Sequence, residues 1–251
     1  MDIIYEDNHI IIVNKSPGEI VQGDKTGDRP LSEMVKAYIK EAYAKPGEVF
    51  LGVVHRLDRP VGGLVVFART SKALARLNEM FRKGEVRKTY WAIVPVPKEG
   101  GSCPPLHQSV RLEQWLVRNE QQNKSYAYDR EVPRSKKAVL DYRFLAFGDR
   151  YALVEVDLHT GRHHQIRCQL AKAGFPIKGD LKYGARRSNP DGSISLIARS
   201  VDFIHPVSKK QIHVEAPLPE GLWKSLEPRH GASSNSISGQ SIESNHSEYS
   251  E

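Results

Sequence analysis

Two apolar runs on either side of a charged turn constrain the fold of this chain more than any other feature. The first run covers residues 49–54 and the second residues 64–68. Because nearly every side chain in both runs is apolar, we expect two strands that are buried on both faces. The turn between them holds Asp58, with Arg56 and Arg59 close by. A carboxylate in such a turn is most often part of a structural ion pair, so these residues alone do not establish a catalytic role.

The rest of the chain predicts many strands and a few scattered helices. Apolar residues at helical spacing indicate helices after Pro30, between Thr70 and Gly84, and over residues 163–173. Residues 95–137 are rich in Pro, Gly, Gln, Asn and charge and should form loops and short strands. Further strands are expected at residues 9–13, 89–94, 138–144 and 151–158. This order favours an α+β fold with a mixed or largely antiparallel sheet.

The charge of the chain is concentrated before its last segment. Of the 37 basic and 30 acidic residues, only Glu243, Glu248 and Glu251 lie in residues 230–251, so residues 1–229 carry 37 basic against 27 acidic side chains, a net +10. That excess suits a polyanion such as RNA or DNA, although many basic proteins bind neither. Residues 230–251 contain eight serines and few apolar residues. We therefore expect one domain over residues 1–229 and a disordered Ser-rich tail.

The cysteine content and the hydropathy pattern indicate the compartment. Cys103 and Cys168 are the only cysteines, and neither has metal-ligand spacing. No apolar run approaches the roughly 18 residues that a membrane helix needs, and the first residues do not resemble a signal peptide. We expect a cytoplasmic protein without membrane association.

Several segments of the chain match the motifs of one known family, in the same order. The matching segments are Tyr5–Asp7, Lys15–Gly18, His55–Asp58 with Gly63 and Leu64, Lys88–Val94, Thr160–Arg167, Gly174–Ile177 and Gly179–Gly184. Each segment alone is common, but their order and spacing over about residues 1–218 are specific. On these residues the chain resembles the RluA family of pseudouridine synthases.

The resemblance implies isomerisation of uridine to pseudouridine within RNA, in ribosomal RNA or alternatively in transfer RNA, without metal or organic cofactor. It places the family's catalytic aspartate on Asp58, its active-site tyrosine on Tyr90 and its basic partner on Arg167. It also implies the pseudouridine synthase fold, a mixed, mostly antiparallel bent sheet that is flanked by helices and loops, with the active site in a central cleft. The catalytic domain is expected to span residues 1–229.

The residue types suit this chemistry. The base must be cut from the sugar, turned and rejoined through carbon 5, so a nucleophile must act while the free uracil stays trapped. The Asp58 carboxylate can attack or stabilise the sugar, or add to the ring, and the sequence leaves these routes open. Arg167 is expected to keep that carboxylate ionised and to aim it. Tyr90 offers a face for stacking and a hydroxyl for the proton at carbon 5.

RNA contacts are expected from the same segments. The candidate residues are Arg56, Arg59, Lys88, Arg162, His163 and Gln165. His163 and His164 are neighbours and should face different directions on a helix, which excludes a zinc site of the His-x-x-x-His type. RNA is the expected partner, with no metal, no obligatory protein partner and a monomeric chain.

Two other functions and some departures from the family pattern remain. A non-catalytic RNA-binding protein that kept the fold would not need the intact Asp58, Tyr90 and Arg167. A glycoside hydrolase would need a pair of carboxylates, and only Asp58 stands out.

The chain departs from the family pattern at two positions. Relatives usually carry Ser at the position of Gly62 and His at that of Ile197. A separate N-terminal RNA-binding domain is not expected, so substrate choice should come from the loops of the catalytic domain.

Overall fold

The computed structural model describes residues 1–24, 26–97 and 103–228. The strands are β1 (Asp2–Glu6), β2 (Ile10–Lys15), β3 (Gly52–Val53), β4 (Gly62–Ala68), β5 (Arg87–Pro95), β6 (Val110–Asn119), β7 (Lys124–Tyr128), β8 (Lys136–Phe147), β9 (Tyr151–Leu158), β10 (Leu196–Ile204) and β11 (Gln211–Glu215). The helices are α1 (Leu31–Ala42), α2 (Ser71–Lys83), α3 (Gln165–Lys172) and α4 (Leu222–Leu226), with a 3₁₀ turn at Leu181–Tyr183. The tail expected at residues 230–251 lies outside the described residues.

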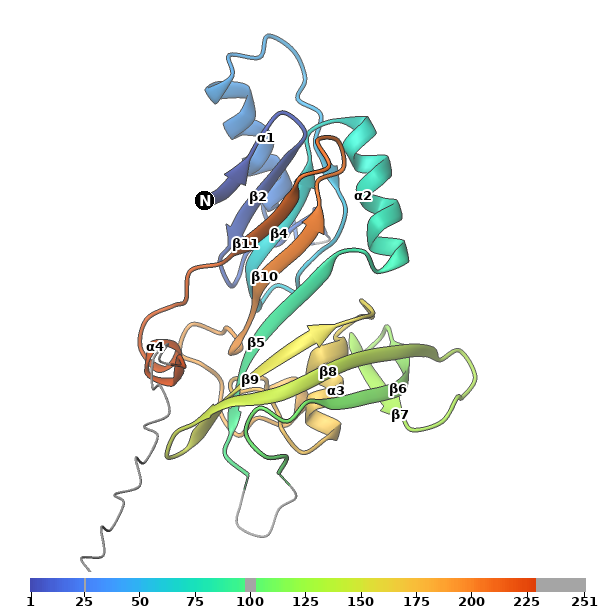
Figure 1. Cartoon of the computed structure of the whole chain (residues 1–251), viewed down its shortest axis with the longest axis vertical. Coiled ribbons are helices and arrows are strands. Elements are labelled where there is room, and N and C mark those ends of the chain that lie inside the picture. The colour runs from blue at the N-terminus through green and yellow to red at the C-terminus, as the bar shows by residue number, and fades with distance from the viewer. Residues whose placement is uncertain (25, 98–102, 229–251) are drawn as a thin grey trace, which may run out of the picture.

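In the described part of the chain, eleven strands form one sheet in the order β1-β2-β4-β10-β5-β9-β8-β6-β7, with β11 beside β10 and β3 beside β4. Every pair is antiparallel except β10 with β4. Figure 1 shows that the sheet bends at β5, where the strands of the upper half give way to β9, β8 and β6, which cross the lower half in another direction. The predicted α+β fold with a mixed, mostly antiparallel bent sheet is confirmed.

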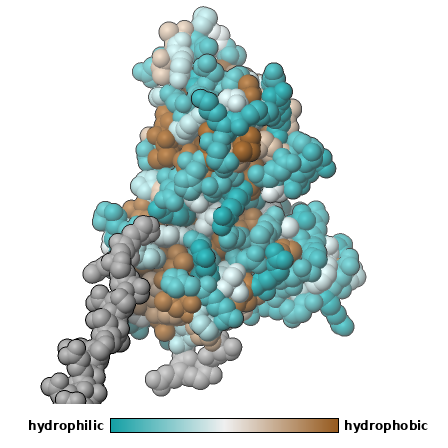
Figure 2. Space-filling view, viewed as in Figure 1, coloured by the Kyte–Doolittle hydropathy of each residue, from teal (hydrophilic) through white to brown (hydrophobic). Residues whose placement is uncertain are grey.

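The apolar run of β4 is buried on both faces, as expected. Val65 and Phe67 belong to the larger core cluster, which also contains residues of α1 and α3. Leu64 and Val66 belong to the second cluster, which α2 covers from the opposite face. Because successive side chains of a strand alternate between faces, only a continuous apolar run can fill both cores. On the face shown in Figure 2, hydrophilic residues predominate at the surface.

The strand predicted over residues 49–54 is much shorter in the structure, where β3 holds only Gly52 and Val53. Beyond Val53, the His55 side chain bonds to β4 in place of further strand residues. The His55 Nε2 atom accepts a hydrogen bond of 2.9 Å from the Val66 backbone N–H, between the positions of β4 that pair with β3 and with β10. An imidazole nitrogen thus satisfies a backbone donor that a longer strand would otherwise have satisfied.

Other elements agree with the sequence or differ from it locally. The helix α2 begins at the Thr70 cap and ends at Gly84 in a left-handed conformation, as predicted. The segment expected to hold only loops and short strands contains β6, which has ten residues. Its side chains alternate between more and less buried as far as Val117, but the more buried face carries the polar Gln114 and the other face the apolar Trp115 and Val117, which hides the pattern. None of the described helices is long and apolar enough to span a membrane.

Gly63 allows the parallel pairing of β4 with β10. Its φ of +106° is unfavourable for residues with a side chain. A Cβ atom at this position would also overlap the backbone of Ala198 in β10. Because β10 joins β4 to β5, the absence of a side chain here brings the turn containing Asp58 close to the strand that carries Tyr90.

Candidate active site

A cleft of about 900 Å³ lies between the end of α2 and the segment that connects β9 to α3. Its lining includes the turn around Asp58, Tyr90 of β5 and Arg167 of α3. The three residues predicted as catalytic are therefore brought together from segments that lie far apart in the sequence. Figure 1 shows the elements that carry this lining: α2 ends above the lower half of the sheet, where α3 lies, and β5 runs between the two halves.

A buried lysine, Lys15, holds the turn that carries Asp58 in place. Lys15 is 1% exposed, and its Nζ atom donates to the carbonyl oxygens of Ser16, Arg59 and Val61 at 3.0, 3.1 and 2.7 Å. Burial lowers the pKa of Lys15 to about 8, although the carboxylates of Glu19 and Asp58 oppose this shift. The backbone after Asp58 is thus fixed to β2.

Arg167 connects Asp58 to a second carboxylate. Its Nη1 atom donates to Asp58 Oδ2 at 2.9 Å, while its Nε and Nη2 atoms donate to both oxygens of Asp180 at 2.7 and 2.9 Å. Burial alone would lower the pKa of the guanidinium, but the two carboxylates outweigh burial and raise it. The bidentate pair with Asp180 fixes the plane of the guanidinium, so the remaining nitrogen is aimed at Asp58.

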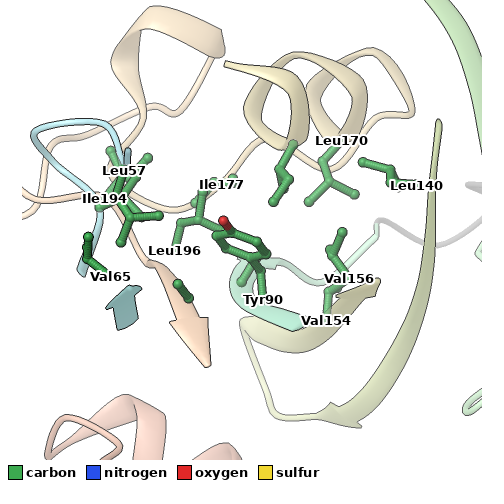
Figure 3. Packing of buried hydrophobic residues seen from close by; sticks show 14 of the residues in the cluster. Leu57, Val65, Tyr90, Leu140, Val154, Val156, Leu170, Ile177, Ile194 and Leu196 are labelled. Atoms are coloured by element: carbon green, nitrogen blue, oxygen red, sulfur yellow. The ribbon is translucent and has the colours of Figure 1, made fainter. Parts of the chain in front are cut away.

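Tyr90 packs in the core and also lines the cleft. The side chain is 7% exposed, and Figure 3 shows its ring among Ile177, Leu196 and Val156. Burial raises the pKa of the hydroxyl, and the Asp58 carboxylate raises it further. The hydroxyl therefore keeps its proton at neutral pH.

The two adjacent histidines differ from their prediction. They do not face different directions on a helix: α3 begins at Gln165, and the rings of His163 and His164 stack at 3.8 Å with an angle of 21° between their planes. The cause is the left-handed backbone of His164, with φ of +51°. Among the residues that the structure describes, no group of three or more His, Cys, Asp or Glu side chains could hold a metal ion.

Of the six residues predicted to bind RNA, five line the cleft and one does not. Arg56, Lys88, Arg162 and His163 line the cleft. Arg59 is not among the lining residues, and it forms an ion pair of 2.7 Å with Asp28. Gln165 also lines the cleft, but it is 3% exposed. Its amide oxygen accepts from the Thr160 hydroxyl and the Arg162 N–H. Because its amide nitrogen donates to the Val139 carbonyl, Gln165 holds the turn in place, and its contact with RNA stays a prediction.

Sequence reasoning assigned no role to Lys15, Asp180 and Tyr183, and it expected His164 to orient loops or to contact RNA rather than to lie beside Asp58, although all four residues lie in segments that carry the resemblance. His164 Nε2 is 3.4 Å from Asp58 Oδ2, and the Tyr183 ring lies 5.2 Å from the Arg167 guanidinium. The signal that was available is a pattern of charged or aromatic residues in otherwise glycine-rich motifs. Their partners are distant in sequence, so only the fold reveals the contacts.

The low pKa of His55, which precedes the turn that carries Asp58, predicts that the protein loses stability in mild acid. Burial, and then the nearby Lys88 ammonium, lower the pKa of His55 from 6.5 to about 3. Between those pH values the unfolded chain binds a proton that the folded chain does not, so stability falls as pH falls below 6.5. Between pH 6.5 and pH 5 this difference lowers the free energy of unfolding by about 2 kcal/mol. Urea unfolding at pH 7 and pH 5 should show a smaller loss for His55→Gln, which can still accept from Val66.

The control for this measurement is His107→Asn, which removes an exposed histidine with a left-handed backbone. It should lose as much stability between pH 7 and pH 5 as the wild-type protein. Equal losses in His55→Gln and in the wild-type protein would contradict the assignment of His55 as a partly buried, neutral group.

Known proteins resemble this chain over most of its length. The model of the RNA pseudouridylate synthase family matches residues 9–172. A Bacillus subtilis protein named as an uncharacterized RNA pseudouridine synthase is 32% identical over 231 residues, which cover 90% of this chain and 72% of that protein. The ribosomal large subunit pseudouridine synthase C of Vibrio cholerae is 31% identical, over 89% of this chain and 68% of the relative.

A solved structure shows the same fold. The human protein titled RNA pseudouridylate synthase domain containing 4 superposes with a TM-score of 0.68 and is 24% identical in sequence. The match covers 87% of this chain and 88% of that structure.

Proposed function

Because the chain belongs to the RluA family of RNA pseudouridine synthases, which are isomerases that convert uridine in RNA to pseudouridine, we propose that Asp58 is the nucleophile of this reaction. The observation that carries the proposal is the position of its carboxylate. Asp58 Oδ2 accepts from the buried Arg167 at 2.9 Å, and the side chain remains 29% exposed in the cleft. It is thus both held in place and accessible to a substrate.

The reaction breaks the bond between the sugar and nitrogen 1 of uracil and forms a bond from the sugar to carbon 5. Carbon 5 loses a proton, and nitrogen 1 ends with one. Whether the carboxylate attacks the sugar or the ring, or assists departure of the base, it must be ionised and must lie beside the uridine. Arg167 provides for both, because a fixed positive charge favours the carboxylate and limits its rotation.

Tyr90 is proposed to hold the uracil and to take part in the proton transfer at carbon 5. Its raised pKa has two causes, burial and the Asp58 charge. If the carboxylate becomes bonded to carbon, its negative charge is lost and the second cause disappears. The hydroxyl can then give its proton to nitrogen 1 more readily, and the phenolate that results can accept the proton from carbon 5, so that Tyr90 ends the reaction protonated.

The cleft favours RNA over a small sugar substrate. Arg56, Lys88 and Arg162 lie around the cleft, as expected for contacts with phosphates on either side of a flipped nucleotide. We propose ribosomal RNA as the substrate, because the Vibrio cholerae relative is named as a ribosomal large subunit synthase. Transfer RNA is the alternative within this activity, and a non-catalytic RNA-binding protein is the alternative outside it.

Release of tritium from RNA that carries uridine labelled at carbon 5 tests this function. The purified wild-type protein should release tritium from ribosomal RNA transcripts and leave transfer RNA transcripts unchanged. Release from transfer RNA alone would contradict the proposed substrate. RNA binding without release from either RNA would favour the non-catalytic alternative.

A further inference from the structure

His164 lies between Asp58 and the buried Tyr183 hydroxyl, which takes no part in the proposed catalytic steps. Its Nε2 atom is 3.4 Å from Asp58 Oδ2, and its Nδ1 atom is 3.0 Å from the Tyr183 hydroxyl oxygen. His164 and Tyr183 are each 8% exposed. Water therefore has little access to either side chain, and their hydrogen bonds must be satisfied within the protein.

The partners of Tyr183 determine where the proton of His164 is located. The Tyr183 hydroxyl oxygen accepts from the Ser125 N–H at 2.8 Å. Within the described part of the chain, the remaining hydrogen-bond partner of this hydroxyl is His164 Nδ1. A buried hydroxyl needs an acceptor for its single proton, so Nδ1 accepts and carries no hydrogen. The ring proton of a neutral imidazole is then on Nε2, which faces the carboxylate of Asp58.

The surroundings of His164 keep it neutral. Burial lowers the pKa of its imidazole to about 3; the Asp58 carboxylate opposes this shift, whereas Arg167, His163 and Lys182 add to it. His163 also stacks on the ring at 3.8 Å and limits its rotation. A neutral ring with one proton of fixed position is suited to orient a carboxylate, but not to transfer protons near neutral pH.

We propose that His164 is a positioning residue for Asp58, with its proton fixed on Nε2 by the Tyr183 hydroxyl. Arg167 and His164 both approach the same oxygen, Oδ2. Within the described residues no hydrogen bond reaches Oδ1, so this oxygen is left free to face the uridine. The inference rests on the proposed role of Asp58 as nucleophile and adds to it which of the two oxygens reacts.

Two substitutions separate this role from a purely structural one. In His164→Gln the side-chain amide nitrogen reaches the position of Nε2 and still presents an N–H toward Asp58 Oδ2. In His164→Asn the amide nitrogen reaches only the position of Nδ1. Asn tolerates the left-handed backbone of this position better than Gln does. A structural role therefore predicts that Asn is the better replacement, and the positioning role predicts Gln.

Single-turnover rates and RNA affinity are measured for both variants. We expect His164→Gln to keep a rate within a few-fold of the wild-type rate. His164→Asn should be slower by about 10-fold, the lower end of the range for a hydrogen bond to a charged group, because the contact is 3.4 Å long, with RNA affinity unchanged. Rates for Asn that equal or exceed those for Gln would overturn the proposal.

A second measurement does not depend on activity. Nitrogen-15 NMR of labelled histidine in the free protein distinguishes the two imidazole tautomers, and the spectrum of His164→Gln identifies the His164 signals among those of the ten histidines. The wild-type protein should show the Nε2–H tautomer at pH 7, and Tyr183→Phe should show a mixture. An Nδ1–H or doubly protonated ring in the wild-type protein would overturn the proposal. If Asp58→Ala retained activity, the proposed function would fail while the tautomer result stood.

Discussion

Asp58→Ala and Asp58→Asn should both reduce tritium release from labelled RNA to background, by at least about 10⁴-fold, as the loss of a nucleophile does in other enzymes. Asn is the sharper of the two changes. It keeps the shape of the side chain and an oxygen that can accept from Arg167, and it removes only the negative charge and the nucleophilicity. RNA affinity should stay close to that of the wild-type protein, because the carboxylate does not contribute to phosphate binding.

Asp157→Asn is a matched control. Asp157 is also paired with an arginine, Arg87 at 3.1 Å, and is 28% exposed compared with 29% for Asp58. It does not line the cleft. Its amide variant should therefore turn over at the wild-type rate. A fully active Asp58→Ala protein, or equal losses in the two Asn variants, would contradict the assignment of the nucleophile.

Tyr90→Phe should bind RNA normally and lose turnover by about 10²-fold or more, the contribution typical of a general acid–base group. Phe keeps the stacking face and removes only the hydroxyl. Within the described residues no hydrogen bond reaches that hydroxyl, so its removal should not destabilise the fold. A loss of turnover can then be attributed to the proton transfer at carbon 5.

Two further variants complete this experiment. Tyr142→Phe removes a hydroxyl from a 4% exposed tyrosine of the same core cluster that does not line the cleft, and it should be fully active. Tyr90→Ala should also weaken RNA binding, because the flipped base loses its stacking partner. Single-turnover rates and affinities on one RNA provide the test. Near-normal turnover in Tyr90→Phe would leave stacking as the only role of this residue.

The local elements of the fold could be predicted because they depend on neighbouring residues. The run of β4 is apolar throughout because both of its faces are buried, and α2 has a cap at Thr70 and a glycine at its end. The exceptions have tertiary causes. The strand before the turn is short because the His55 ring bonds to β4, and no local pattern encodes that contact.

The same distinction applies to the site. The motifs around Asp58, Tyr90 and Arg167 could be found as segments, but their partners could not. Asp180 fixes Arg167 from 13 residues away in sequence, and Lys15 supports the catalytic turn from 44 and 46 residues away. The orientation of the histidines was predicted wrongly because periodicity assumes a regular helix, whereas the left-handed backbone of His164 ends that regularity.

The position of β10 also determines when the sheet can be completed while the chain is being synthesised. This strand follows β1 to β9 in the chain, yet it lies between β4 and β5, which are made earlier. Until residues 196–204 leave the ribosome, a nascent chain that already contains every proposed catalytic residue carries two incomplete sheets with unpaired inner edges. Such edges are the part of a β protein most prone to aggregate. We therefore expect the active site to form and the exposed edges to disappear together, when β10 pairs with β4 and β5.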